Sequence, residues 1–335
     1  MYIVVTGAAG FIGSNLVQAL NRRGETNIIA VDNLEEGDKF RNLADADIAD
    51  YLDQDEFLSR LGAGDFEDDL TAILHEGACS DTMATDGRYM MRNNYRYSVD
   101  LVTYCQDNDV PLIYASSAAV YGNNRVFREE RECETPRNLY AYSKLLFDQY
   151  VRQVLPERTA QIVGLRYFNV YGAREGHKGR MASVALHFFD QFRAEGSVRL
   201  FEGSDGYAAG EQRRDFIAVD DAVKATLYFL DHRERSGIFN VGTGNAAAFN
   251  DVATAVINAC RKAGGHGAAT HADHLREGRI VYTPFPPQLV GKYQSFTQAD
   301  LSKLRAVGYT ESFVPVADGV HRYVESLISG SPSSP

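Results

Sequence analysis

The chain opens on the stretch Tyr2-Ile3-Val4-Val5-Thr6-Gly7-Ala8-Ala9-Gly10-Phe11-Ile12-Gly13. Its apolar beginning is typical of a strand buried on both faces of a parallel sheet, and its glycines precede an amphipathic helical stretch. Gly7 permits a tight turn, Gly10 lets the main chain approach a pyrophosphate, and Gly13 lets the helix pack closely on the strand. Free N–H groups at the helix N-terminus then face the phosphates. The stretch therefore predicts a dinucleotide-binding turn.

Further short apolar runs, separated by helix-like stretches, follow at residues 27–31, 72–77, 112–116 and 162–168. Repeated strand–helix–strand units predict an α/β fold with a doubly wound, parallel Rossmann sheet. After residue 175 the alternation of strand-like and helix-like stretches becomes less regular. Residues 205–212 and 263–278 are rich in glycine or alanine and lack a periodic apolar face, so we expect them to be loops. The last five residues, 331–335, have the composition of a disordered tail.

The composition is that of an ordinary globular protein, because 44% of the 335 residues are hydrophobic and 24% are charged. There are 34 Lys and Arg against 45 Asp and Glu, and the resulting net charge of −11 argues against nucleic acid as a partner. The N-terminus shows no signal-peptide pattern, and no apolar run is long enough to span a membrane. The four cysteines form no Cys-x-x-Cys pair, so we expect a reduced, cytoplasmic protein without a metal site.

Asp32 and Lys39, at and beyond the end of the second predicted strand, bear on the choice of cofactor. Asp32 ends that strand, about twenty residues beyond the glycine turn, and its carboxylate suits the ribose 2′-hydroxyl of NAD. Lys39 follows closely and suits the 2′-phosphate of NADP, although it also fits a solvated loop lysine. The residues alone therefore leave NAD and NADP open.

A second motif, Tyr140-Ala141-Tyr142-Ser143-Lys144, places a tyrosine and a lysine on one face of a helix. The ammonium group of Lys144 favours the tyrosinate form of Tyr140, so the phenol can act as a general acid or base near neutral pH. Upstream, Ser116-Ser117 ends a predicted strand at the carboxyl edge of the sheet, where ligands bind. A serine there can hydrogen-bond the substrate hydroxyl that Tyr140 serves.

Together these motifs resemble the extended short-chain dehydrogenase/reductase family of nucleotide-sugar enzymes, over nearly the full chain. The resemblance includes three later runs, Arg166 to Gly172, Arg214 to Asp221 and Phe239 to Gly244. It implies an NADP-binding Rossmann domain over residues 1–170, to which some later segments return, and a mainly substrate-binding, smaller α/β lobe over residues 171–330. It assigns the catalytic role to Ser117 rather than Ser116. Dehydratases of the family carry an Asp-Glu pair where this chain has Ala118-Ala119, so epimerisation or reduction remains.

Longer runs narrow the resemblance: His75 to Ser80, Tyr167 to Gly179 and Tyr293 to Leu301 are similar to the branch that epimerises ADP-linked heptoses at C6″. This branch implies transient oxidation by a tightly bound, recycled NADP+, in preference to NAD, to a 6″-keto sugar that is reduced again from its other face. Tyr140 and Lys178 would be the two acid/base groups. The resemblance further implies a homo-oligomer, a pentamer, and a role in making the heptose of the lipopolysaccharide core.

The resemblance also implies which residues bind the two ligands. Those for the cofactor are Gly7, Gly10, Phe11, Ile12, Gly13, Asp32, Asn33, Lys39, Gln54, Glu76, Gly77, Ala78, Cys79, Ser80, Asn93, Lys144, Val170 and Lys178. Those for the substrate are Asn169, Arg180, His187, Phe201, Glu202, Gly203, Ser204, Arg214 and Tyr293. Among them Arg214 suits the diphosphate, because a guanidinium group binds phosphate through two hydrogen bonds.

Two other functions stay open at this point. Another nucleotide-sugar epimerase, such as a UDP-hexose 4-epimerase, swings the whole keto-sugar past one tyrosine and does not require Lys178. A cofactor-sensing binding module that has lost catalysis would usually lack the tyrosine or the lysine of the pair, and Tyr140 and Lys144 are both present.

Overall fold

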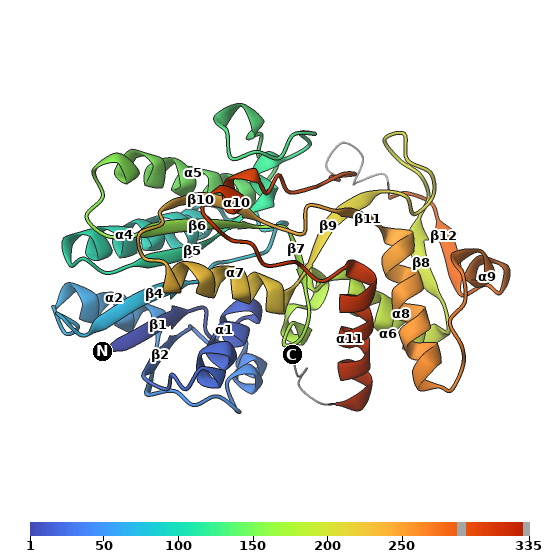
Figure 1. Ribbon diagram of the computed structural model, residues 1–335, viewed down its shortest axis with the longest axis horizontal. Coiled ribbons are helices and arrows are strands. Elements are labelled where there is room, and N and C mark those ends of the chain that lie inside the picture. Colours follow the sequence, from blue (N-terminus) through green and yellow to red (C-terminus); the bar gives the residue numbers. More distant parts are fainter. Residues whose placement is uncertain (287–292, 331–335) are drawn as a thin grey trace.

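The computed structural model describes residues 1–286 and 293–330, and its centre is a seven-stranded sheet (Figure 1). The strand order is β10-β6-β5-β4-β1-β2-β3, and all neighbouring strands are parallel. From β1 the sheet grows in both directions, which confirms the predicted doubly wound Rossmann sheet. The strands are β1 (Tyr2–Thr6), β2 (Ile28–Val31), β3 (Asp50–Leu52), β4 (Leu70–His75), β5 (Leu112–Ser117), β6 (Ile162–Tyr167) and β10 (Gly237–Val241).

Helices cover both faces of this sheet. The α-helices are α1 (Phe11–Arg22), α2 (Gln54–Gly62), α3 (Gly87–Met90), α4 (Tyr97–Asp107), α5 (Leu139–Val154), α7 (Val219–Asp231) and α10 (Ser302–Ala306). Shorter helical turns are η1 (Gly37–Asn42), η3 (Ala118–Tyr121), η4 (Arg131–Cys133) and η5 (Leu155–Glu157), and the π-helix η2 (Met91–Arg96) joins α3 to α4.

Alternate residues of each strand enter different hydrophobic cores. In β1, Ile3 and Val5 pack into a core with α1 and α7, whereas Val4 packs into a core with α2, α4 and α5. Both faces of the strand are therefore buried, and this burial explains the continuous apolar run that predicted it.

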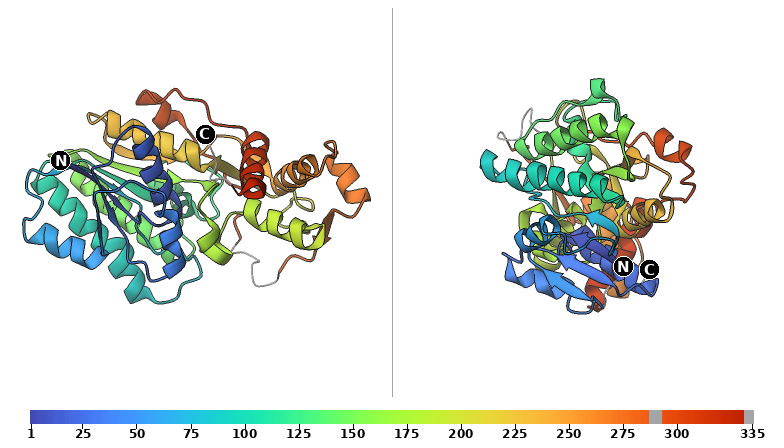
Figure 2. Two further views of the ribbon diagram at one scale, coloured as in Figure 1. Left: turned by 90° about the horizontal axis from the view of Figure 1, so that it is seen from below. Right: turned by 90° about the vertical axis from the view of Figure 1, so that its left-hand side faces the viewer.

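A smaller lobe lies beyond the carboxyl ends of the central strands, as the left view of Figure 2 shows. The chain reaches it directly from β6, because β7 already pairs with β9 in a second sheet. The strands of this lobe are β7 (Asn169–Tyr171), β8 (Val198–Phe201), β9 (Arg213–Ala218), β11 (Ala246–Ala248) and β12 (Ile280–Thr283). Its helices are η6 (Gly176–Met181), α6 (Val184–Glu195), α8 (Phe249–Ala263), α9 (His271–Arg276) and α11 (Val316–Ser329).

The expectation of a loop at residues 263–278 is wrong in its second half. Helix α9 forms there, with Thr270 as its N-cap: the Thr270 hydroxyl accepts a hydrogen bond from the Asp273 amide, and the Asp273 carboxylate accepts one from the Thr270 amide. His274 is fully buried and its Nε2 lies 3.1 Å from Asn258 Oδ1 on α8. The expected loop at residues 205–212 is confirmed, and the tail expected at residues 331–335 lies outside the described residues.

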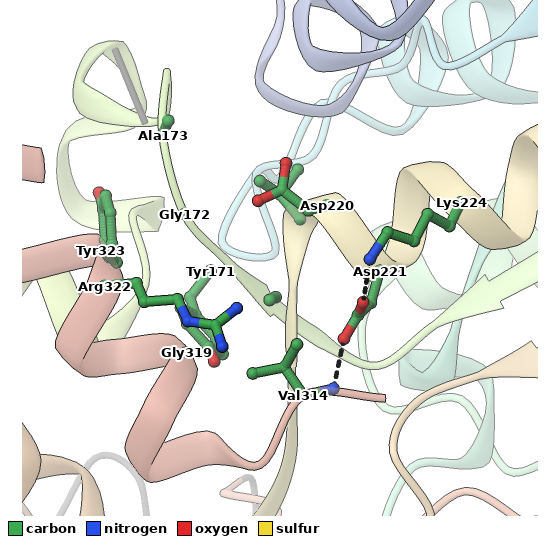
Figure 3. A pocket seen from close by; sticks show the side chains of 12 residues that line it. Tyr171, Gly172, Ala173, Asp220, Asp221, Lys224, Val314, Gly319, Arg322 and Tyr323 are labelled. Atoms are coloured by element: carbon green, nitrogen blue, oxygen red, sulfur yellow. Dashed lines mark hydrogen bonds and ion pairs between the residues drawn. The ribbon is translucent and has the colours of Figure 1, made fainter. Parts of the chain in front are cut away.

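A small cavity of about 80 Å³ lies where β7, α7 and α11 meet (Figure 3). Tyr171 and Gly319 face each other at its wall, and a Cβ atom on Gly319 would lie 2.0 Å from the Tyr171 hydroxyl. Asp221 holds the adjoining chain, since its carboxylate accepts hydrogen bonds from Lys224 and from the Val314 amide. None of the predicted catalytic residues lines this cavity. In the two described ranges, no helix is both long and apolar enough to cross a membrane.

Candidate active site

The glycine turn between β1 and α1 is shaped by close contacts of the main chain. Gly7 has a φ of 64°, and a Cβ on it would lie 2.7 Å from the backbone of Gly77, just after β4. A Cβ on Gly13 would lie 2.1 Å from the Gly7 carbonyl oxygen. Gly10, the N-cap of α1, provides no side-chain cap, so the first amides of the helix are available to an anion. This bare turn fits the pyrophosphate of a dinucleotide.

Asp32 and Lys39, which suggest different cofactors, form an ion pair with each other. Lys39 Nζ lies 2.6 Å from Asp32 Oδ1, and the other carboxylate oxygen accepts a hydrogen bond from the Ala9 amide at 3.0 Å. The carboxylate therefore ties the glycine turn to η1. The neighbouring Asn33 caps a turn by accepting a hydrogen bond from the Glu35 amide.

Asn94 holds the segment after β4, residues 76–80, through hydrogen bonds to its main chain. This residue is not among those predicted from the sequence. The Asn94 side chain accepts a hydrogen bond from the Cys79 amide at 2.8 Å and donates one to the Cys79 carbonyl at 2.9 Å. It also lies 3.1 Å from the Ser143 hydroxyl on α5. Asn94 belongs to a π-helix, a distortion often found at functional sites, but nothing in the sequence pattern marks that distortion. The predicted Asn93 donates to Asn94 Oδ1, and Gln54 begins α2, where its carbonyl accepts from Tyr97.

The predicted catalytic residues Ser117, Tyr140 and Lys144, here called the triad, lie together at the carboxyl end of β5. Tyr140 stands in the first turn of α5, behind its N-cap Asn138, and its side chain hydrogen-bonds Ser117. Burial raises the pKa of Tyr140 and the bond to Ser117 opposes that rise. Ser116 points elsewhere, because its hydroxyl donates to Asp148 at 2.9 Å. Lys144, one turn beyond Tyr140, donates to the Ala115 carbonyl at 2.7 Å.

Glu76 faces Lys144 across this site and accepts a hydrogen bond from the Tyr167 hydroxyl at 3.0 Å. Its second carboxylate oxygen is buried without a hydrogen-bond partner among the described residues. Burial raises the pKa of Glu76 to about 7, against the opposing effects of Tyr167 and Lys144. Burial also lowers the pKa of Lys144 to about 8, with Glu76 as the strongest opposing charge. Both groups therefore change charge near neutral pH.

Beneath the triad, a buried ionic network anchors α5 to the sheet. Arg166, fully buried on β6, donates to Asp148 at 2.9 Å and to the Tyr121 hydroxyl at 3.0 Å, and it pairs with Glu134. Asp148 lies one turn after Lys144 on α5 and also accepts from Tyr114 at 2.9 Å. The sequence alone does not reveal this network, because the partner carboxylates are far from Arg166 in the chain.

Lys178, on η6, is half-buried, and its Nζ lies 4.9 Å from the centre of the Phe11 ring at the start of α1. Burial lowers the pKa of Lys178, and the Glu175 carboxylate opposes that effect. Glu175 is itself buried and braces the segment, since it accepts hydrogen bonds from the Gly172 amide at 3.2 Å and from the Ser183 hydroxyl at 2.7 Å. A desolvated amine of this kind can exchange a proton with a ligand.

The smaller lobe brings Phe201, Arg214 and Tyr293 together. The Arg214 guanidinium stacks 4.8 Å above the Tyr293 ring, and its Nη1 is buried without a partner among the described residues. Phe285 completes an aromatic cluster, with its ring 5.5 Å from those of Phe201 and Tyr293. Phe249 lies 6.4 Å from Tyr293. Sequence reasoning missed Phe285 and Phe249, because neither lies in a recognisable motif.

Other predicted substrate residues are spread more widely. Arg180 is mostly exposed and pairs with Asp81 at 2.6 Å, which draws its guanidinium toward the segment after β4. His187 lies in the first turn of α6, and Asn169 Oδ1 accepts from Thr297 at 3.5 Å. Ser204 accepts a hydrogen bond from Gln212 at 3.1 Å within the loop that follows β8. Within residues 1–286 and 293–330, no group of three His, Cys, Asp or Glu side chains could hold a metal ion.

Comparison with known proteins gives the family of this chain. A curated ADP-L-glycero-D-manno-heptose-6-epimerase of Thiobacillus denitrificans is 63% identical over 327 residues, 98% of each chain. The crystal structure of the Helicobacter pylori enzyme of that name superposes with a TM-score of 0.80 at 26% identity, covering 98% of this chain and 96% of that one. A UDP-glucose 4-epimerase of Thermus thermophilus in complex with NAD gives a TM-score of 0.76 at 26% identity, over 97% and 98% of the two chains. The sequence model described as the NAD dependent epimerase/dehydratase family matches residues 3–242, and the chain belongs to that family.

Proposed function

We propose that this protein is an epimerase that interconverts ADP-D-glycero-D-manno-heptose and ADP-L-glycero-D-manno-heptose at C6″. The observation that carries the proposal is the presence of two half-buried proton-transfer groups on separate elements, Tyr140 beside Ser117 and Lys178 over Phe11. The 63% identity to a curated ADP-heptose epimerase supports the choice of substrate.

Inversion at C6″ needs a proton acceptor for each of the two positions that the oxygen occupies. A bound nicotinamide cofactor supplies the reversible acceptance of hydride from C6″. Tyr140, held by Ser117 and with Lys144 one turn along the same helix, takes the hydroxyl proton in one epimer. Lys178, whose ammonium form is weakened by burial, serves the same oxygen when the keto group has turned over. One hydroxyl proton leaves on oxidation, one proton is delivered to the oxygen on re-reduction, and the hydride returns to C6″, so the reaction has no net redox change.

The aromatic cluster and Arg214 would hold the nucleotide part of the substrate. A buried guanidinium with an unpaired N–H suits a diphosphate, which accepts two parallel hydrogen bonds. The rings of Phe201, Phe285 and Tyr293 offer apolar faces against which a base can stack.

We assign NADP rather than NAD to the cofactor site, and we expect it to be retained and recycled. Lys39 and Asn33 border the position after β2 where the adenosine ribose binds in this fold. Asp32 already accepts hydrogen bonds from the Ala9 amide and from Lys39, so a 2′-hydroxyl would share its carboxylate with these donors. A 2′-phosphate would compete with Asp32 for the ammonium group of Lys39.

Two substitutions test the proposal against a UDP-hexose 4-epimerase. Tyr140→Phe and Lys178→Met should each lower epimerisation of ADP-heptose by at least about 100-fold, because each removes one proton acceptor, while the nucleotide cofactor stays bound. Tyr142→Phe is the matched control, since Tyr142 stands on the same helix but is 48% exposed. Full activity of Lys178→Met would reject the two-base mechanism. Turnover of UDP-glucose instead of ADP-heptose would favour the 4-epimerase.

A further inference from the structure

Two asparagine amides bridge the glycine turn to the segment that carries Lys178. Asn15 on α1 donates to the Phe11 carbonyl at 2.8 Å and to the Ala173 carbonyl at 2.9 Å. Asn42 at the end of η1 donates to the Ala9 carbonyl at 2.9 Å and to the Arg174 carbonyl at 3.1 Å. Each amide thus joins one carbonyl of the glycine turn to one of two consecutive carbonyls just before η6. We call Asn15 and Asn42 the asparagine clamp.

Further contacts strengthen the link on the Asn42 side. The side-chain amide nitrogen of Asn42 lies 3.1 Å from Nδ1 of His177, the residue before Lys178. The backbone carbonyl of Asn42 accepts a hydrogen bond from the Arg174 guanidinium at 2.6 Å. Arg174 also forms a two-pronged ion pair with Asp45 at 2.6 and 3.0 Å. Arg174 has a φ of 70°, a conformation costly for a residue with a side chain, so these contacts hold the backbone in a shape that it would not keep alone.

The position of Lys178 therefore depends on the Rossmann domain, although η6 follows the first strand of the smaller lobe. We infer that the asparagine clamp positions Lys178 over the phosphate-binding turn, and so ties this amine to the cofactor site in addition to the contacts that Glu175 makes with the smaller lobe. The role as a proton acceptor rests on the function proposed above, but the mechanical role of the clamp does not. Asn15 and Asn42 are positioning residues, because their contacts are with the main chain of other segments.

Asn15→Ala and Asn42→Ala test the inference, with Asn21→Ala as the matched control. Asn21 also uses its side chain to hold the chain beyond η1, through the amide and carbonyl of Asp47, but it does not contact the Lys178 segment. Hydrogen exchange of the backbone is measured on the whole protein as purified. We expect exchange in peptides covering residues 173–181 to speed up about tenfold in both clamp variants, because each change removes a hydrogen bond to this segment. The control should leave these peptides unchanged.

Kinetics on the same proteins test the consequence for Lys178. Misplacing an acid/base group slows chemistry more than binding, so kcat should fall about 10- to 100-fold with KM and bound nucleotide within about threefold of the parent. The limb of the pH–rate profile that Lys178→Met removes should move to higher pH in the clamp variants, since a looser segment exposes the amine to water.

Hydrogen exchange and kinetics together distinguish the ways in which the inference can be wrong. Unchanged exchange at residues 173–181 in the clamp variants, or an equal change in Asn21→Ala, would overturn the clamp. Faster exchange with an unchanged kcat and pH profile would overturn its role in positioning Lys178. If the parent protein does not epimerise ADP-heptose at all, the proposed function fails, and the exchange measurement still decides whether the clamp holds the segment.

Discussion

At the scale of single residues, the most unusual pair in the site is Glu76 with Lys144. An acid with a pKa of about 7 faces a base with a pKa of about 8, and burial is the chief cause of both shifts. Glu76 is the strongest charge that stabilises the Lys144 ammonium, whereas the Tyr167 hydrogen bond comes before Lys144 in stabilising the Glu76 carboxylate. Removing one of the pair therefore alters the titration of the other. The charge on Lys144 therefore depends on the state of Glu76.

The free energy of unfolding of Glu76→Gln tests whether Glu76 is an acid with a raised pKa in the folded protein. The pKa of Glu76 is raised in the folded protein, from 4.5 to about 7, so the folded state keeps its proton while the unfolded chain loses it. The contribution of Glu76 is therefore fully present below about pH 4.5 and declines as pH rises to about 7. We expect the variant to gain on the order of 1–3 kcal/mol relative to the parent between pH 5 and pH 8. Chemical unfolding at both pH values measures the difference, and a gain that does not grow with pH contradicts the buried acid.

At the scale of elements, helix α5 shows how one element organises the chemistry. Tyr140, Lys144 and Asp148 follow each other at successive turns along one face. Asp148 fixes this face to β5 through Ser116 and to β6 through Arg166, and Tyr140 and Lys144 then lie over the end of β5. The sequence predicted the spacing of Tyr140 and Lys144, but not the anchor, because Asp148 and Arg166 meet only after the strands have paired.

A second element-scale feature is the contact of α11 with β7, where Gly319 meets Tyr171. In an exposed helix, changing glycine to alanine stabilises by up to about 1 kcal/mol, but here the new Cβ would lie 2.0 Å from the Tyr171 hydroxyl. We expect Gly319→Ala to destabilise by roughly 1–3 kcal/mol, as overpacking does.

Two further variants test whether contact with the Tyr171 hydroxyl causes the expected destabilisation by Gly319→Ala. Gly62→Ala, in α2, has open space for a Cβ and should be neutral or stabilising. Adding Tyr171→Phe to Gly319→Ala should restore at least half of the loss, since that hydroxyl has no partner among the described residues. Thermal unfolding of the four proteins gives the answer, and a neutral Gly319→Ala would contradict the tight contact.

Element prediction from the sequence succeeded where a pattern was periodic and failed where tertiary contacts decide. The continuous apolar runs predicted five of the seven strands of the sheet, because each run is buried on both faces, but β3 and β10 were not predicted. Helix α9 was missed, because its stability comes from a capping box and from burying a single histidine, His274, rather than from an apolar stripe. Asn94 was missed because a π-helix leaves no periodic signature.

At the scale of the whole molecule, the residues of the proposed site come from two lobes. The Rossmann domain contains the glycine turn, Ser117, Tyr140, Lys144 and the proposed asparagine clamp, while the smaller lobe contains Arg214 and its aromatic cluster. A substrate that reaches from C6″ to its nucleotide would therefore bridge the lobes. The sequence predicted the residues of both halves through family resemblance, but not Phe285, which joins the cluster only through folding.

Cofactor choice is also tested on the whole molecule. A ligand that binds only the folded state stabilises it by about 2.7 kcal/mol at a hundred times its Kd. After nucleotide removal, we expect NADP+ to raise Tm by roughly 5 °C or more and NAD+ at the same concentration by less. Lys39→Ala should abolish this difference, because it removes the cation that would meet the 2′-phosphate. A larger shift with NAD+ would mean that Asp32 governs the site instead.

The most direct measurement of the central claim is proton NMR of the purified protein with ADP-D-glycero-D-manno-heptose in heavy water, without added cofactor. Epimerisation by a retained, recycled nicotinamide cofactor predicts conversion to the L-glycero epimer with no deuterium at C6″, because the hydrogen that leaves carbon returns to it. No conversion, with or without added NADP+, would contradict the assigned substrate, and deuterium at C6″ would contradict transient oxidation by a cofactor that stays bound.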